Sequence, residues 1–137
     1  MSYAYGEALS DTSKLYGRDS VDLLARMIYA EAENQSWDGK AACAHVAKNR
    51  KADGRFGGNT YEAVLLCRTP AVQFVGMWTT RALRPTLSST AWNDSLAIAL
   101  NMATVTNPIG NRLYFGVSAP SGAKDVLTIG GHKFFNM

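Results

Sequence analysis

Residues 23–50 read LLARMIYAEAENQSWDGKAACAHVAKNR, and this stretch decides the fold because it predicts two consecutive helices joined by a short turn. Successive residues of an α-helix are about 100° apart, so the apolar residues of the first helix gather on one face. That face holds Val21, Leu24, Ala25, Ile28 and Ala32, whereas Asp22, Arg26, Tyr29 and Glu33 fall opposite. The pattern predicts an amphipathic helix that is capped by Asp19 or Ser20 and ends near Asn34.

Glu31 lies at the edge of the apolar face of this helix. The residues three, four and seven positions before it are Ile28, Met27 and Leu24. Apolar surroundings disfavour the charged form of a carboxyl group and raise its pKa, which makes Glu31 a candidate general acid. From the residues alone, a helix-end acid paired with a lysine or arginine is an equally good interpretation. Glu33 is expected to be an ordinary solvated acid.

The second helix is expected to run from Trp37 to about Lys51, with Ser36 as its cap, and to form a hairpin with the first. His45 and Asn49 are four residues apart on one face of this helix, so they predict a satisfied, buried polar pair.

The rest of the chain predicts further helices and then a sheet. Thr60 can cap a short third helix over YEAVLL, and residues 69–89, which contain Pro70 and Pro85, are expected to be irregular. A fourth helix is expected from Ser89 or Thr90 to about residue 103. Its predicted core stripe is Trp92, Leu96, Ala99, Leu100 and Ala103. Beyond Pro108, the segments LYFGV, VLTIGG and HKFF predict a small antiparallel sheet.

The composition fits one mostly helical α+β domain. The chain has 137 residues, of which 47% are apolar and 18% charged, enough to bury a core without metals or disulfides. We expect residues 1–18 to form an N-terminal arm or lead-in helix, and residues 19–137 to form a single catalytic domain. Cys43 and Cys67 have no metal-site spacing, which indicates two reduced thiols or one disulfide.

Charge and hydropathy exclude several classes of protein. No apolar run approaches the roughly 20 residues of a membrane span, and the N-terminus lacks the residue order of a signal peptide. The net charge is +3, but the basic residues are scattered, so no nucleic-acid partner is expected. We also expect no membrane partner and a monomeric protein.

Four motifs in this order resemble the cell wall hydrolase family of the spore cortex-lytic enzymes SleB and CwlJ. They are IYAEA (28–32) with the later WDGK and NR, the pair Gln73 and Phe74, NRLYF (111–115) and IGGHKFF (129–135). The resemblance covers roughly residues 23–135. It implies a lysozyme-like fold related to lytic transglycosylases, peptidoglycan glycan strands as the substrate, and Glu31 at the position of the catalytic glutamate. Family members tend to have Arg-Gly-Glu-Pro after the Glu-Ala pair, where this chain has Glu-Asn-Gln-Ser (33–36).

The reaction type is predicted by counting carboxylates. Glycoside hydrolysis ordinarily uses two, about 5–5.5 Å or 6.5–9.5 Å apart, and no second one is evident here. A lytic transglycosylase needs only one, because the 6-hydroxyl of the sugar attacks in place of water and gives a 1,6-anhydro product. This is the predicted function, with cleavage between N-acetylmuramic acid and N-acetylglucosamine. The alternatives are a hydrolytic muramidase, a non-catalytic wall-binding module and a zinc amidase.

Four further residues are predicted to bind the substrate: Gln73, Trp78, Tyr114 and His132. The polar ones suit hydrogen bonds to sugar hydroxyl and acetamido groups, or the positioning of Glu31, and the tryptophan suits stacking on a sugar. Ordinary loop and core contacts are the alternative for each. His45, His132 and a carboxylate could in principle bind zinc, but no metal motif is present, so no metal or cofactor is expected. We expect the protein to act on the bacterial cell wall, after holin-type release or within the spore.

Overall fold

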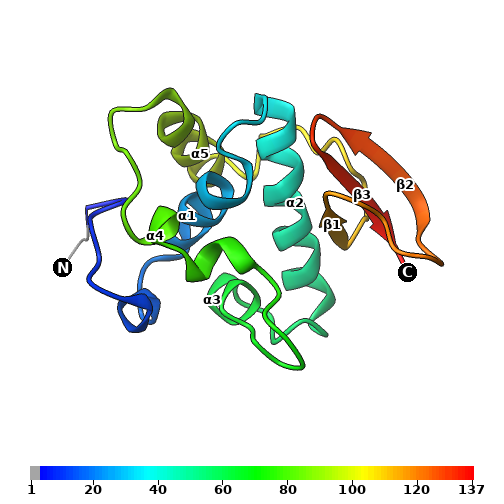
Figure 1. The fold of residues 1–137 in the computed structure, drawn as a ribbon, viewed down its shortest axis with the longest axis horizontal. Coiled ribbons are helices and arrows are strands. Elements are labelled where there is room, and N and C mark those ends of the chain that lie inside the picture. Colours follow the sequence, from blue (N-terminus) through cyan, green and yellow to red (C-terminus); the bar gives the residue numbers. More distant parts are fainter. Residues whose placement is uncertain (1–3) are drawn as a thin grey trace.

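The computed structural model describes residues 4–137, so the first three residues of the predicted arm lie outside the described part. Seven helices and three strands follow one another within residues 4–137, and Figure 1 shows their arrangement in space. The helices are η1 (Thr12–Leu15), α1 (Ser20–Ala32), α2 (Trp37–Asp53), α3 (Tyr61–Leu65), η2 (Val75–Trp78), α4 (Thr80–Leu83) and α5 (Thr90–Leu100). The strands are β1 (Tyr114–Gly116), β2 (Lys124–Ile129) and β3 (His132–Asn136). The predicted fold class, mostly helical α+β with a small antiparallel sheet near the C-terminus, is confirmed.

Helix α1 is the central helix of the fold. Its cap is Asp19, whose carboxylate accepts a hydrogen bond from the Val21 backbone nitrogen at 3.0 Å. The helix packs against α2, α3, α4, α5 and η2, and it is buried along nearly its whole length. The expected amphipathic pattern is therefore wrong: Asp22, Arg26 and Tyr29, which fall opposite the apolar face, are also buried.

Mutual pairing explains how Asp22 and Arg26 can be buried. Asp22 Oδ2 accepts hydrogen bonds from Arg26 Nε at 2.7 Å and from Arg18 Nε at 2.6 Å, and its Oδ1 accepts one from the Gly6 nitrogen at 2.7 Å. Arg26 also donates to the backbone oxygens of Glu7, at 2.6 Å, and of Ala82, at 2.8 Å. A charge can leave water when a partner and hydrogen bonds replace its solvation. The same bonds fasten the N-terminal segment and α4 to α1.

Helix α2 lies between the other helices and the sheet (Figure 1). Ser36 caps it as predicted, and it ends at Gly54, whose φ of 85° closes the helix in a left-handed conformation. His45 and Asn49 are both satisfied, by backbone oxygens of the loop that precedes the sheet. His45 Nε2 lies 3.2 Å from Val105 O, and Asn49 Nδ2 donates to Gly110 O at 2.9 Å and Arg112 O at 2.8 Å.

Two predictions about the second half of the chain need correction. The segment predicted to be irregular, residues 69–89, contains the short helices η2 and α4. Helix α5 ends at Leu100 rather than near residue 103, and Leu100 is 51% exposed, so it is not part of the core stripe. Ser95 of the same helix is buried, which is possible because its hydroxyl donates to Ala91 O at 2.7 Å.

The sheet has the strand order β1-β3-β2, with both pairs antiparallel. In the central strand, Phe134 pairs with Phe115 of β1 and with Leu127 of β2. The β2–β3 hairpin turns at Gly130 and Gly131, next to the loop between α1 and α2, where Gln35 Oε1 accepts a hydrogen bond from the Gly131 nitrogen at 2.9 Å. The sheet is thereby attached to the end of α1.

Two further observations concern the described residues as a whole. None of the helices within residues 4–137 is long and apolar enough to cross a lipid bilayer. Cys43 and Cys67 are both free thiols, as the first of the two expectations for them states.

Candidate active site

Glu31 lies in the last turn of α1 and is half-buried. Its Oε1 accepts a hydrogen bond from the Gly76 backbone nitrogen at 2.6 Å. Burial raises the pKa of Glu31, and the Gly76 hydrogen bond opposes part of this effect because it favours the carboxylate. Among the described residues Glu31 forms no ion pair, so the alternative interpretation of a helix-end acid paired with lysine or arginine is wrong.

The second carboxyl oxygen of Glu31 reaches solvent. Within residues 4–137, Oε2 accepts no hydrogen bond, and the indole nitrogen of Trp78 is the one buried side-chain polar atom that lacks a partner. Because Oε2 has no hydrogen-bond partner and is not among the buried polar atoms that lack one, it must be exposed to solvent. One oxygen of the acid is held by the backbone, and the other is accessible to a substrate.

Gly76 can approach Glu31 because it has no side chain. A Cβ atom at this position would lie 2.7 Å from Glu31 Oε1 and 3.0 Å from Ala30 Cβ, too close for either contact. Sequence reasoning missed this residue. The available signal was a single glycine in a segment without regular pattern, which often marks a close approach of the backbone.

Glu33 is in a different environment, although it is only two residues from Glu31. Its carboxylate lies 3.1 Å from Arg81 Nε, and the two side chains are 38% and 54% exposed. Residues two positions apart point to different sides of a helix, which explains the contrast. The expectation of a solvated Glu33 is confirmed, with the addition of an exposed ion pair.

The loop that follows Glu31 is held by two polar side chains. Lys40, buried in the first turns of α2, donates from Nζ to the backbone oxygens of Glu33, at 3.1 Å, and Gln35, at 2.5 Å. Gln35 in turn binds the hairpin turn, where a Cβ on Gly130 would lie 2.3 Å from Gln35 Oε1. Gln35, which occupies a position where the sequence departs from the family pattern, thus joins the sheet to the site.

His132 contacts Cys43, whose thiol feels the charge of Glu31. The Cys43 sulfur is 3.9 Å from His132 Nδ1. Burial raises the pKa of the Cys43 thiol, and the charge of Glu31 raises it further, so the thiol stays protonated. Burial also lowers the pKa of His132, so its ring is neutral at neutral pH.

Gln73 and Tyr114 meet at a second group of side chains, around Arg50. Gln73 Oε1 accepts from Arg50 Nη1 at 3.3 Å, and its Nε2 donates to Ala71 O at 2.8 Å. The Tyr114 ring lies 5.2 Å from the Arg50 guanidinium and stacks on Phe135. Sequence reasoning did not single out Arg50, although it belongs to the NR motif.

Trp78 follows Gly76 by two residues and is half-buried against the core. The Arg68 guanidinium lies 4.7 Å from the centre of its ring. The predicted residues thus form two groups: Glu31 with His132 and Trp78 near Gly76, and Gln73 with Tyr114 at Arg50. The segment 73–76 joins them, as do ring contacts of Phe115 with Phe74 and with His132.

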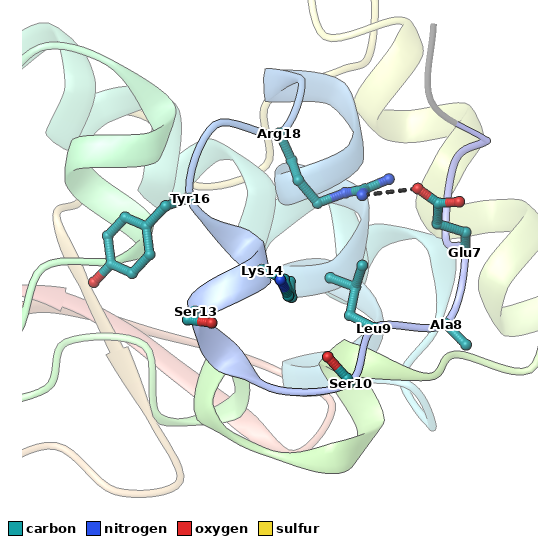
Figure 2. A pocket seen from close by; sticks show the side chains of 8 residues that line it. All are labelled: Glu7, Ala8, Leu9, Ser10, Ser13, Lys14, Tyr16 and Arg18. Carbon is teal, nitrogen blue, oxygen red and sulfur yellow. Dashed lines mark hydrogen bonds and ion pairs between the residues drawn. The ribbon is translucent and has the colours of Figure 1, made fainter.

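The clearest hollow lies away from these groups. It measures about 530 Å³ and is lined by residues of the N-terminal segment, where Arg18 pairs with Glu7 (Figure 2). Arg18 and Glu31 are at opposite ends of α1, roughly 20 Å apart at 1.5 Å per residue. We therefore locate the site by its chemical groups and not by this hollow. Among the described residues, no three histidine, cysteine, aspartate or glutamate side chains come together as a metal site would require.

The arrangement defines an α+β domain with a half-buried acid at the end of its central helix and a sheet attached beside it. The structure is similar to the catalytic domain of the germination-specific lytic transglycosylase SleB from Bacillus anthracis, with a TM-score of 0.65 and 22% identity over 88% of this chain and 97% of that one. The catalytic domain of the SleB protein of Bacillus cereus gives a TM-score of 0.62 and 23% identity over 85% and 89% of the two chains. No protein-family model matches the sequence, and no curated protein does. The resemblance to SleB predicted from the four motifs is confirmed at the level of the fold.

Proposed function

We propose that the protein cleaves the glycan strands of bacterial peptidoglycan, between N-acetylmuramic acid and N-acetylglucosamine, as a lytic transglycosylase. The observation that carries this proposal is Glu31: an acid with a raised pKa, one oxygen held by the backbone and the other open to solvent. Its position in the fold of a SleB catalytic domain, a lytic transglycosylase in the Bacillus anthracis protein, supports the same conclusion.

The other acids support a reaction with one carboxyl group. All eleven acidic residues lie within residues 4–137, and seven of the remaining ten are engaged by a neighbouring group. These seven are Glu7, Asp11, Asp19, Asp22, Glu33, Asp53 and Glu62. Asp38 is exposed in the first turn of α2, Asp94 is on α5, and Asp125 is exposed on β2. Burial and the Gly76 hydrogen bond are the causes of the Glu31 pKa shift, and no neighbouring carboxylate contributes to it, so a second carboxylate that could activate water is not evident.

The chemistry then follows from the two states of Glu31. The protonated acid gives its proton to the glycosidic oxygen while the bond to the muramic acid C1 breaks, and the departing sugar leaves as an alcohol. The resulting carboxylate accepts the proton of the 6-hydroxyl group as that oxygen bonds to C1. The product is a 1,6-anhydro sugar, and Glu31 is protonated again. The Gly76 N–H stabilises the carboxylate between the two steps.

The remaining predicted residues are proposed to bind the substrate or to shape its site. The neutral ring of His132 and the phenol of Tyr114 can exchange hydrogen bonds with sugar hydroxyl and acetamido groups. Trp78, two residues after Gly76, has an indole with Arg68 over its ring and is proposed to stack on a sugar. Gln73 has both ends of its amide engaged with protein, so its contribution is to shape the segment before Gly76. With this substrate, the protein acts in the cell wall, reached by holin-type release or within the spore.

Mass spectrometry of fragments released from purified sacculi tests the proposal. With ¹⁸O-labelled water present, we expect unlabelled fragments that end in 1,6-anhydromuramic acid and are one water lighter than hydrolytic products. A chelator should not change the rate. Labelled reducing ends would instead identify a muramidase, and free stem peptides would identify an amidase. Binding without any released fragment would identify a wall-binding module.

A further inference from the structure

Arg50 is a buried cation that the proposed reaction does not use. It is 5% exposed, and among the described residues it forms no ion pair with a carboxylate. Burial lowers its pKa to about 10. A buried charge without a counter-ion is costly, so the contacts that replace solvent around it indicate what it is for.

Those contacts join three parts of the chain that are distant in sequence. Arg50 Nε donates to Leu113 O at 2.6 Å, which holds the start of β1, and Nη1 donates to Gln73 Oε1 at 3.3 Å. Three rings surround the guanidinium, with centres 4.5 to 5.3 Å from its carbon: Phe56, Tyr114 and Phe74. Such contacts stabilise a cation through the negative faces of the rings. Arg50 therefore fixes the position of Gln73 and Phe74 relative to α2 and the sheet.

The segment that Arg50 holds is the one that reaches Glu31. Gln73 and Phe74 are followed after one residue by Gly76, whose N–H donates to Glu31 Oε1 at 2.6 Å. Three residues span at most about 10 Å. The segment 73–76 therefore runs between two anchors, with Arg50 at one end and Glu31 at the other.

The charge of Arg50 does not contribute to the pKa of Glu31, so any influence of Arg50 on Glu31 has to pass through this segment. The pKa of Glu31 responds to burial and to the Gly76 hydrogen bond, and no basic residue contributes to it. The hydrogen bond needs the Gly76 nitrogen in a particular place, and that place depends on where Gln73 and Phe74 are held.

We propose that Arg50 is a positioning residue of the reaction, which holds the segment 73–76 so that the Gly76 N–H meets Glu31. The inference rests on the proposed function for its kinetic consequences. The positioning itself concerns the protonation of Glu31 and can be measured without any substrate.

The main variant is Arg50→Lys, which keeps the positive charge but loses the planar fork that binds Leu113 O and Gln73 Oε1 together. We expect kcat to fall about 10- to 100-fold, because a displacement near 1 Å can have an effect of this size, with KM within twofold. The upper limb of the pH profile of kcat should move to higher pH. The hydrogen bond from the Gly76 N–H favours the carboxylate form of Glu31. Its loss therefore raises the pKa of Glu31, and the acid stays protonated to a higher pH.

A double-mutant cycle separates this role from others. Gln73→Leu removes the acceptor for Arg50 at similar volume, and it should reproduce both the kcat loss and the movement of the limb. The double variant should be no worse than Arg50→Lys, because both act on one connection. If Gln73 instead contacts sugar, its substitution raises KM and adds to the effect of Arg50→Lys.

Asn49→Ala is the matched control. Asn49 precedes Arg50 on α2 and binds the backbone oxygens of Gly110 and Arg112, with no hydrogen bond to the segment 73–76. This variant should lower the melting temperature and leave the upper limb of the pH profile of kcat at its wild-type position.

A carboxyl NMR titration of Glu31 gives the substrate-free measurement. Arg50→Lys and Gln73→Leu should both raise its pKa above that of the wild type, and this comparison decides the proposal even if the wild type releases no glycan fragments. If Arg50→Lys does not fold, Gln73→Leu carries the test. An unmoved Glu31 titration in a folded variant, additive losses in the cycle, or a limb that moves equally in Asn49→Ala would overturn the role of Arg50.

Discussion

Helix α1 carries one acid near each end, and the two have opposite surroundings. Asp22, in the first turn, is fully buried and accepts hydrogen bonds from two arginines and a backbone nitrogen. Glu31, in the last turn, is half-buried and accepts a single hydrogen bond from a backbone nitrogen. Both are taken out of water by the same helix, but only Asp22 receives full compensation.

The difference separates an acid that supports the fold from one suited to chemistry. The oxygens of Asp22 accept hydrogen bonds from two guanidinium groups and a backbone nitrogen, which leaves no capacity for a substrate. A carboxyl group without a cation retains its proton more readily and has an oxygen available. The two ends of α1 should therefore respond differently to the same kind of substitution, which replaces an acid with its amide.

The largest effect is expected for Glu31→Gln, measured as the release of fragments from purified sacculi. The amide keeps the shape of the side chain and an oxygen for Gly76, but it cannot transfer a proton. General acid catalysis contributes roughly 100- to 10,000-fold, so the rate should fall by at least this factor while the melting temperature is maintained. Lysis at the wild-type rate would show that Glu31 is not the acid.

Asp22→Asn should change stability instead. It removes the ion pair of Arg26, which is fully buried, whereas Arg18 keeps its ion pair with Glu7. Removing one member of a buried ion pair costs about 3–5 kcal/mol, which denaturant unfolding would measure. At temperatures where the variant remains folded, the rate per folded molecule should be close to that of the wild type. A loss below about 1 kcal/mol would mean that the pairing contributes little.

A smaller effect is expected in the pH dependence of stability. The pKa of Glu31 is raised in the folded protein, so its contribution to stability is fully present below the pKa of the unfolded chain and is lost as pH rises through the folded value. Glu31→Gln does not lose stability in this way, because the glutamine amide does not titrate. Unfolding free energies measured from pH 4 to 8 should show the variant gaining on the wild type as pH rises. A constant difference between them would contradict the raised pKa.

The smallest effect is expected for Glu33→Gln. Glu33 lies at the same end of α1 as Glu31 but on another side of the helix, so this variant tests whether the side of the helix decides which acid is needed for activity. Glu33 pairs with Arg81 at the surface, and such pairs contribute about 0–1 kcal/mol. Fragment release and unfolding should both stay near wild-type values. A loss of activity comparable to that of Glu31→Gln would show that the second carboxylate of a hydrolytic mechanism is Glu33.

The parts of this structure that were predictable are those determined locally. The caps Ser36, Thr60 and Ser89 fix helix starts through hydrogen bonds within three residues, and the sequence shows them directly. The inward position of Glu31 also follows from its helical neighbours.

The failures arose where distant partners decide the outcome. Asp22 and Arg26 are buried because Gly6, Glu7 and Ala82 complete their hydrogen bonds, and no periodicity reveals that. Gly76 and Arg50 were missed for the same reason: each is important through a contact made across the fold, by a backbone nitrogen and by a guanidinium without a carboxylate partner. Pattern analysis of a single sequence is sensitive to neighbours on one element and insensitive to these connections.

The burial of α1 also has a consequence for how the molecule opens. Because five elements cover this helix, its amide hydrogens should exchange with solvent only when the whole domain unfolds. Strand β2, whose residues 124–126 are exposed at the edge of the sheet, has no such cover and should exchange by local opening. The edge of the sheet should therefore open first, while Glu31 stays on the element that is the last to unfold.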